Sequence, residues 1–84
     1  MSVREAVAAL PLEQREAYAA ALEAGADWLQ THGHNAAASR DAIPERYPYY
    51  AEAFAEADAT ASMMLRQAAL LKLLAVVFRG LPSN

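Results

Sequence analysis

The stretch Ala68–Phe78, AALLKLLAVVF, is apolar on nearly every side of a helix and is interrupted only by Lys72. It forms the last third of a candidate helix that begins near Tyr47. A helix that is apolar all round has to be covered all round. A chain of 84 residues has little other material with which to cover it. The stretch therefore predicts that the protein completes its core by binding another chain.

Composition limits the ways in which so small a chain can be stabilised. We expect a single domain over residues 1–84. Folding at this size buries only about 60–65% of the surface of the unfolded chain, so disulfides, a metal or oligomerisation usually contribute. Cysteine is absent, which excludes disulfides and thiolate metal sites. Oligomerisation is the support that remains, and we predict a homodimer.

No segment alternates between apolar and polar residues as a strand does, so the pattern predicts an all-α fold. The expected architecture is a small helical bundle or helical hairpin with a long C-terminal helix. The expected elements are a short helix over 3–10, a helix over 11–31, a loop or short helix over 34–47 and a long helix over 48–79.

Local signals set these boundaries. Ser2 followed by Glu5 has the form of a capping box. Pro11 suits the first turn of a helix, as does Pro48. Gly33 is a natural terminator of the second helix.

The long helix carries a seam of residues whose spacing alternates between four and three, which is typical of a coiled-coil contact face. We predict this seam to be the dimer or partner interface. Its residues are Tyr50, Phe54, Ala57, Ala61, Met64, Ala68, Leu71, Ala75 and Phe78. Apolar residues off the seam are expected to be covered by the second helix through Leu22, Trp28 and Leu29. They are Leu70, Leu73, Leu74 and Val77.

An alternative breaks the long helix near Asp58–Ser62, because Asp58, Thr60 and Ser62 are better caps than interior helix residues. Whether one helix or two form over this stretch is left open by the pattern, as is parallel or antiparallel pairing of the dimer.

The aromatic run before the long helix is a possible second partner surface. Arg46, Tyr47 and Tyr49 belong to residue types that are enriched at binding hot spots. Adjacent helical residues point about 100° apart, so these aromatic side chains cannot all face one core. The structural alternative is that they fasten the preceding loop onto the bundle.

Catalytic and ligand motifs are not recognisable, so we predict a protein that is not an enzyme and has no cofactor or metal. His32 and His34 flank Gly33, and imidazole is a common zinc ligand. Asp41 and Glu45 are the nearby residues that could complete such a site. The simpler interpretation is that His32 lies at the carbonyl end of a helix while His34 is solvated.

One short segment resembles a known family. Leu10–Ala17, LPLEQREA, is similar to the helix that opens the DNA-binding region 4 of sigma-70-type factors. In that family a helix-turn-helix follows, whereas Gly33–Ala36 starts no recognisable turn and basic helix. The resemblance supplies the alternative function, a transcription-associated DNA-binding regulator. The net charge of −3 and the dispersed basic residues make nucleic acid an unfavourable partner.

The predicted function is a small helical module that binds and modulates another protein, as inhibitors and adaptors of bacteria or phages do, and that acts as a homodimer. The sequence shows no signal peptide, and the apolar stretch of about 11 residues is shorter than the roughly 20 that cross a bilayer. We therefore expect a cytoplasmic protein that does not enter a membrane.

Overall fold

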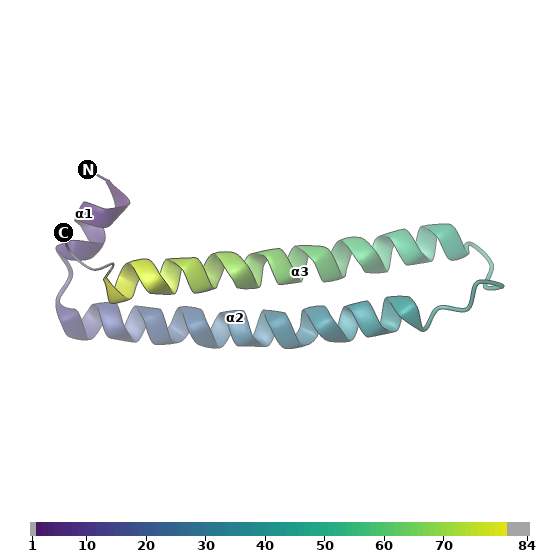
Figure 1. Cartoon of the computed structure of the whole chain (residues 1–84), viewed down its shortest axis with the longest axis horizontal. Coiled ribbons are helices and arrows are strands. Elements are labelled where there is room, and N and C mark those ends of the chain that lie inside the picture. The colour runs from purple at the N-terminus through teal and green to yellow at the C-terminus, as the bar shows by residue number, and fades with distance from the viewer. Residues whose placement is uncertain (1, 81–84) are drawn as a thin grey trace.

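Two long antiparallel helices make up most of the molecule (Figure 1). The computed structural model describes residues 2–80. Within them, α1 spans Val3–Ala8, α2 spans Leu12–Asp41 and α3 spans Tyr50–Arg79. No strand occurs in this part of the chain, so the prediction of an all-α helical hairpin with a long C-terminal helix is confirmed.

The hairpin is a rod and not a sphere, with extents of 56 × 22 × 17 Å. Its radius of gyration is 17.8 Å, whereas a compact chain of this length is expected near 12 Å. α1 lies beside the end of the rod where α2 begins and α3 ends (Figure 1).

Ser2 starts α1 as predicted, because its Oγ accepts a hydrogen bond of 3.2 Å from the Glu5 N–H. Val7 is the residue that α1 buries, with 5% of its surface exposed. The helix ends at Ala8 and not at Leu10. The reason is Pro11, whose ring disfavours helical geometry at the preceding residue.

α2 ends ten residues beyond the predicted helix over 11–31, since it continues to Asp41. The loop and short helix predicted over 34–47 are therefore wrong for residues 34–41. Ala36, Ala37 and Ala38 continue α2, in keeping with the helix propensity of alanine. α2 ends at Asp41, three residues before Pro44. The last helical hydrogen bond is donated by the Ala42 N–H to the Ala38 carbonyl at 3.0 Å.

Gly33 does not terminate a helix but lies buried inside one. A Cβ at this position would stand 2.9 Å from Leu65 Cγ and 3.3 Å from Met64 Cβ. The glycine is therefore required by the close approach of α3, and not by a change of chain direction. The turn that a helix-turn-helix needs after the sigma-like segment is thus absent at Gly33–Ala36, where α2 is continuous.

The connection between the long helices, residues 42–49, is closed by two short hydrogen bonds. The Tyr47 N–H donates to the Pro44 carbonyl at 2.9 Å, and the Tyr50 N–H donates to the Tyr47 carbonyl at 3.0 Å. Tyr49 precedes α3 in the left-handed conformation, with φ 63°. α3 consequently begins at Tyr50, two residues after the predicted start at Pro48.

α3 is a single helix, and the predicted alternative of a break near Asp58–Ser62 does not occur. Two of the three residues that weaken this stretch, Asp58 and Thr60, form hydrogen bonds. Asp58 accepts a hydrogen bond of 2.6 Å from Arg40 of α2. Thr60 Oγ1 donates to the Glu56 carbonyl, one turn earlier, at 3.0 Å.

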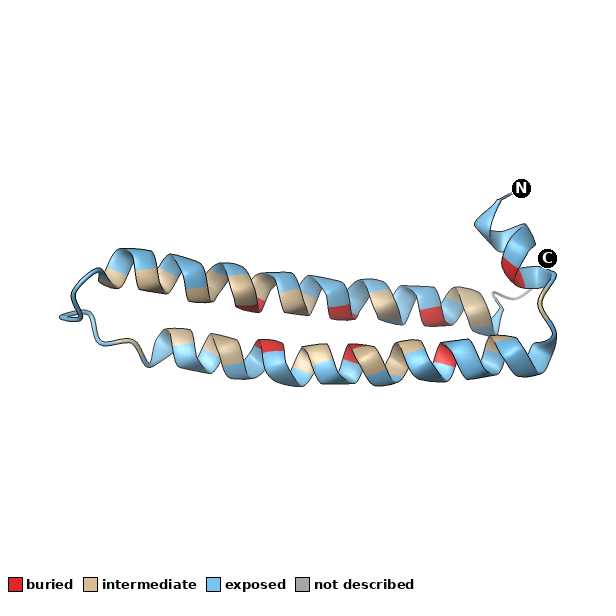
Figure 2. Cartoon of the chain, turned by 180° about the vertical axis from the view of Figure 1, so that it is seen from behind, coloured by how far each residue is buried: buried red, intermediate tan, exposed pale blue. Residues whose placement is uncertain are grey.

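Small residues hold the two helices together (Figure 2). Three residues on the facing side of each long helix, spaced seven apart, are alanine or glycine and are buried. These residues are Ala19, Ala26 and Gly33 on α2 and Ala61, Ala68 and Ala75 on α3. The contact of Gly33 with Met64 sets the register. One heptad further on, this register brings Ala26 level with Leu71.

The small residues Gly25 and Gly33 of α2 thus stand level with larger residues of α3. The Leu71 side chain lies 3.4 Å from the place of a Gly25 Cβ, and the rings of Tyr18 and Phe78 are 5.5 Å apart. No large side chain in residues 2–80 is fully buried. The core of one chain is therefore narrow and rests on close backbone approach.

Gly33→Ala is expected to destabilise the protein, because the new methyl group has no room between Met64 and Leu65. Overpacking of this kind costs about 1–3 kcal/mol, whereas the gain in helix propensity is about 1 kcal/mol. Urea unfolding followed by circular dichroism at 222 nm measures the difference.

Gly25→Ala is the matched control, since its Cβ would meet Leu71 Cδ1 at an ordinary 3.4 Å. This variant is expected to be more stable than the native chain by about 0.5–1 kcal/mol. Equal stability of the two variants would contradict the register described above.

Candidate interaction surfaces

The predicted dimer seam of α3 faces α2 of the same chain. All of its residues, from Tyr50 to Phe78, are buried or half-buried within one chain. Its contacts with α2 include Leu71 against Gly25, Met64 against Gly33 and Phe78 against Tyr18. The seam that was predicted as a dimer or partner interface thus makes an intramolecular contact in this structure.

Of the four predicted residues off the seam, Val77 is half-buried, as are Leu22 and Leu29 of α2, whereas the other three are exposed. We expected the second helix to cover Leu70, Leu73 and Leu74. They are 59%, 64% and 41% exposed. Trp28, which was expected to help cover them, is itself 58% exposed. The reason is that α2 can face only one side of α3, and the seam takes that side.

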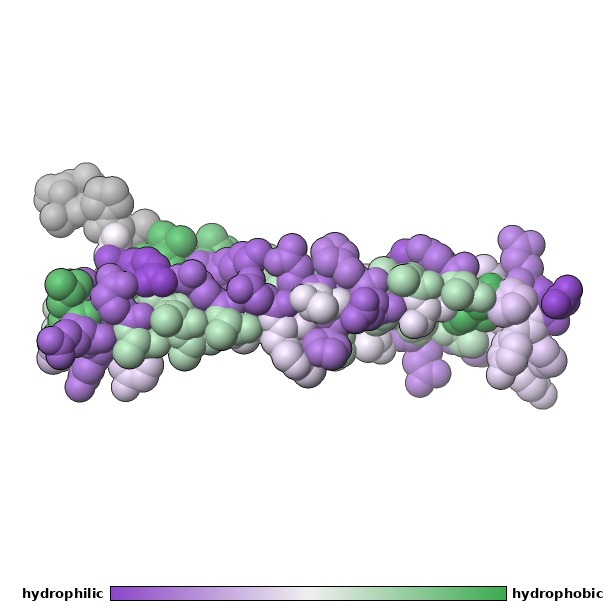
Figure 3. Space-filling model, turned by 90° about the horizontal axis from the view of Figure 1, so that it is seen from below, coloured by the Kyte–Doolittle hydropathy of each residue, from purple (hydrophilic) through white to green (hydrophobic). Residues whose placement is uncertain are grey.

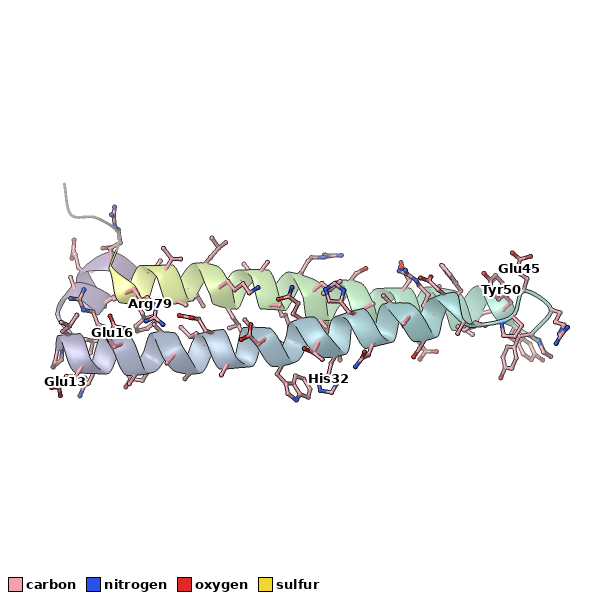
Figure 4. All side chains as sticks on the ribbon, turned by 60° about the horizontal axis from the view of Figure 1, so that its bottom comes forward. Glu13, Glu16, His32, Glu45, Tyr50 and Arg79 are labelled. Atoms are coloured by element: carbon pink, nitrogen blue, oxygen red, sulfur yellow. The ribbon has the colours of Figure 1, made fainter. Side chains whose placement is uncertain are left out.

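One side of the hairpin, the charged flank, is made by α2 residues Glu16, Glu23, Asp27 and Gln30 and α3 residues Lys72, Val76 and Arg79. Glu16 and Arg79 lie side by side between the helices in Figure 4, with Arg79 Nη1 2.7 Å from Glu16 Oε2. Arg79 also pairs with Glu23. Lys72 Nζ donates to Gln30 Oε1 at 2.7 Å. These exposed contacts fix register more than they add stability.

The opposite side, the apolar flank, is made by Tyr18, Ala21, Gly25 and Trp28 of α2 and Gln67, Leu70, Leu71, Leu74 and Phe78 of α3. The spacing of three and four residues keeps each set on one side of its helix. The contacts of Tyr18 with Phe78 and of Gly25 with Leu71 join the two sets. None of these residues is Asp, Glu, Lys or Arg.

Figure 3, which is seen with α2 nearest, shows a band of hydrophilic residues along the rod, with weakly hydrophobic residues below this band in the left half. The hairpin therefore has two unlike sides, one solvated and one suited to burial.

The tip of the hairpin is the third candidate surface. Tyr47 is 54% exposed and Tyr49 is 80% exposed, while Arg46 also lies at the surface. Tyr50, by contrast, packs on Phe54 with ring centroids 5.7 Å apart. The predicted partner residues Arg46, Tyr47 and Tyr49 are thus brought together in one exposed loop, and Tyr50 is the aromatic residue that fastens it.

Arg40 anchors this tip by bridging the two helices. Its guanidinium lies over the Phe54 ring at 5.6 Å and pairs with Asp41 at 2.9 Å and Asp58 at 2.6 Å. The hydrogen bonds to Asp41 and Asp58 raise the pKa of Arg40, and the bond from Arg40 lowers the pKa of Asp41. The stabilisation from Asp41 is therefore present above the ordinary carboxyl pKa of about 4 and is lost as the pH falls through its lowered pKa.

The two histidines do not form the metal site that was considered. His32 and His34 both lie in α2, where residues two apart point about 200° from each other. The His32 ring stacks on Trp28 with centroids 4.0 Å apart and points away from α3 (Figure 4). Among residues 2–80 no group of three or more His, Asp or Glu side chains is placed to hold a metal.

Two further features bear on possible ligands. A shallow pocket of about 320 Å³ lies between α1 and the hairpin and is lined by Arg4, Val7, Arg15 and Val77 among others.

Separately, α3 is long and apolar enough to cross a bilayer by length and composition, and 17% of its most apolar stretch is buried. The apolar segment considered above, Ala68–Phe78, is thus only the end of a longer one.

Tyr49→Gly is expected to raise the free energy of unfolding by about 1 kcal/mol, because a left-handed residue costs about that much when it carries a Cβ. Chemical denaturation measures the change. Tyr47→Gly is the control, because Tyr49 is the non-glycine residue of the described chain with positive φ. A gain in stability from Tyr47→Gly of the same size would show that strain at Tyr49 is not the cause.

No protein-family model, curated protein or solved structure matches the chain. The three surfaces are therefore the basis on which a function is assigned.

Proposed function

We propose that the chain is a non-enzymatic, helical protein–protein interaction module that acts as a homodimer and modulates a target protein. The observation that carries the proposal is the amount of apolar surface that one hairpin leaves uncovered. Leu70, Leu73 and Trp28 are each more than half exposed. These are residue types that proteins ordinarily bury.

The total surface supports the same proposal. The chain exposes 6160 Å². A compact monomer of this mass is expected to expose about 4,900 Å², so the excess is roughly 1,300 Å². Permanent homodimers bury about 2,000–5,000 Å² in total, or about 1,000–2,500 Å² from each partner. An interface of that class with one further chain is enough to bring the exposed area to an ordinary value.

The tip is the surface that we assign to the target. Tyr47 and Tyr49 offer large contact area with little side-chain entropy to lose, and Arg46 offers a charge beside them. Tyr49 also holds a left-handed backbone, and strained conformations cluster at binding sites. The target class is a protein because the tip is convex and aromatic, which suits a complementary pocket on another chain.

A membrane role is the competing candidate that the composition of α3 favours. The hairpin argues against it, because α2 runs beside α3 over the same length. Insertion of the apolar end of α3 would take Glu16, Glu23 and Asp27 into the hydrocarbon as well. A charged side chain at the centre of a bilayer costs about 2.5–3.5 kcal/mol even on the lowest scales.

The oligomeric state tests the proposal. Light scattering after size exclusion at 10–100 µM is expected to give twice the chain mass of 9.1 kDa. The melting temperature is expected to rise with protein concentration, because association stabilises the folded state by mass action. A monomer with a concentration-independent melting temperature would contradict the homodimer.

Flotation with liposomes separates the two candidates. The protein is expected to stay in the dense fraction with neutral vesicles and with vesicles containing anionic lipid. Its net charge of −3 disfavours the anionic surface. Flotation with both kinds of vesicle would favour the membrane role instead.

A further inference from the structure

The two long sides of the hairpin differ in the kind of contact that each can make with another molecule. On the charged flank, Arg79, Lys72 and Glu23 already satisfy one another or bond to neighbours within the chain. On the apolar flank the interhelical contacts are between rings and aliphatic groups, such as Tyr18 with Phe78. Burial of the charged flank would remove water from paired charges, whereas burial of the apolar flank carries no such cost.

The apolar flank is also continuous along the half of the rod near the chain termini. On α2 it carries the residues at 18, 21, 25 and 28, and on α3 those at 67, 70, 71, 74 and 78. Leu74 lies near the middle of the α3 set and is 41% exposed. Towards the tip the flank becomes polar, because this side of α3 carries Thr60 and, one turn closer to the tip, the charged Glu56. The part suited to burial is therefore bounded at one end by a charge.

A second copy of the chain fits this flank better than other occupants do. The surface that the chain exposes beyond a compact monomer, roughly 1,300 Å², is within what each partner of a permanent homodimer buries. Each copy carries a charge of −3. Packing through the apolar flank turns both acidic flanks outwards into solvent, where screening weakens their repulsion.

We propose that two copies pack through the apolar flank to form a four-helix bundle, with the charged flanks on the outside and the heptad seams inside each hairpin. This inference rests on the proposed homodimer and adds the face that forms it. The interface differs from the seam predicted by the heptad spacing of α3, because α2 of the same chain already covers that seam. In the bundle, each long helix faces its own hairpin partner on one side and the second copy on the next.

Leu74→Lys tests the interface, because it sets an unpaired charge at the centre of the apolar flank. The dissociation constant of the dimer is expected to rise by roughly tenfold or more, as for a hot-spot residue that loses its contacts. Val76→Lys is the matched control. Val76 lies two residues away, is 50% exposed and sits on the charged flank beside Glu23 and Asp27. The dissociation constant of the Val76→Lys dimer is expected to equal that of the native dimer.

Trp28 supplies a second measurement that does not depend on a variant. It is the chain's one tryptophan and lies on the apolar flank. Its emission is expected to move to shorter wavelength as protein concentration rises through the dissociation constant, because the second copy covers the indole. Circular dichroism at 222 nm checks that Leu74→Lys remains helical, and a loss of helicity leaves the Trp28 titration as the deciding test.

The outcomes separate this inference from the homodimer itself. A weakened Leu74→Lys dimer, an unchanged Val76→Lys dimer and a blue shift of Trp28 support the proposed face. A native dimer with no shift of Trp28, or equal dissociation of both variants, overturns the face and leaves the homodimer standing. A native monomer at 100 µM overturns both, and the apolar flank then belongs to a different protein or, if the chain floats with liposomes, to lipid.

Discussion

The structure depends on the close approach of two helices over small side chains. Ala19, Ala26 and Gly33 face the seam of α3 at every seventh position, and a methyl group at Gly33 is already too large. Such packing gives many van der Waals contacts but buries little apolar area per residue. At about 0.8 kcal/mol for each buried methylene group, alanine contributes far less than leucine would. The hairpin is therefore well defined in register and modest in stability, and this leaves its larger apolar residues outside.

The two flanks follow from the same constraint. Because the buried line is only one residue wide, the residues on either side of it remain at the surface. On one side they are Glu23 and Arg79, which pair with each other. On the other they are Tyr18, Trp28 and Leu74, which stay 51%, 58% and 41% exposed. A single chain thus has one side whose charges are paired and one side whose apolar residues are exposed.

The sequence allowed the all-α fold and the α3 seam to be predicted, because the spacing from Tyr50 to Phe78 is regular and nearly all of its residues are apolar. The matching line on α2 has the same spacing but includes Arg15, Gly33 and Arg40, so it was not recognised. Gly33 was interpreted as a terminator since glycine usually ends helices. Its role depends on Leu65, which is distant in sequence, and a local rule does not include that contact.

The candidate surfaces were predicted in part for the same reason. Tyr47 and Tyr49 were identified from residue type and position, and both lie exposed at the tip. Leu70 and Leu74 were recognised as apolar residues off the seam, but their cover was assigned to α2. Only the pairing of the helices shows that α2 covers the seam instead. Which of two apolar faces becomes internal is decided by tertiary contacts, and helix periodicity alone leaves that choice open.

The short connection over residues 42–49 has a consequence for the order of folding. The Arg40 and Asp58 side chains meet across 18 residues, Gln30 and Lys72 across 42, and Glu16 and Arg79 across 63. Loop-closure entropy grows with this separation, so we expect pairing to start at the tip and to proceed towards the termini. The last part to close is the half that carries the apolar flank. Association of two copies would then act on the segment that opens most readily, and it would slow unfolding where fraying begins.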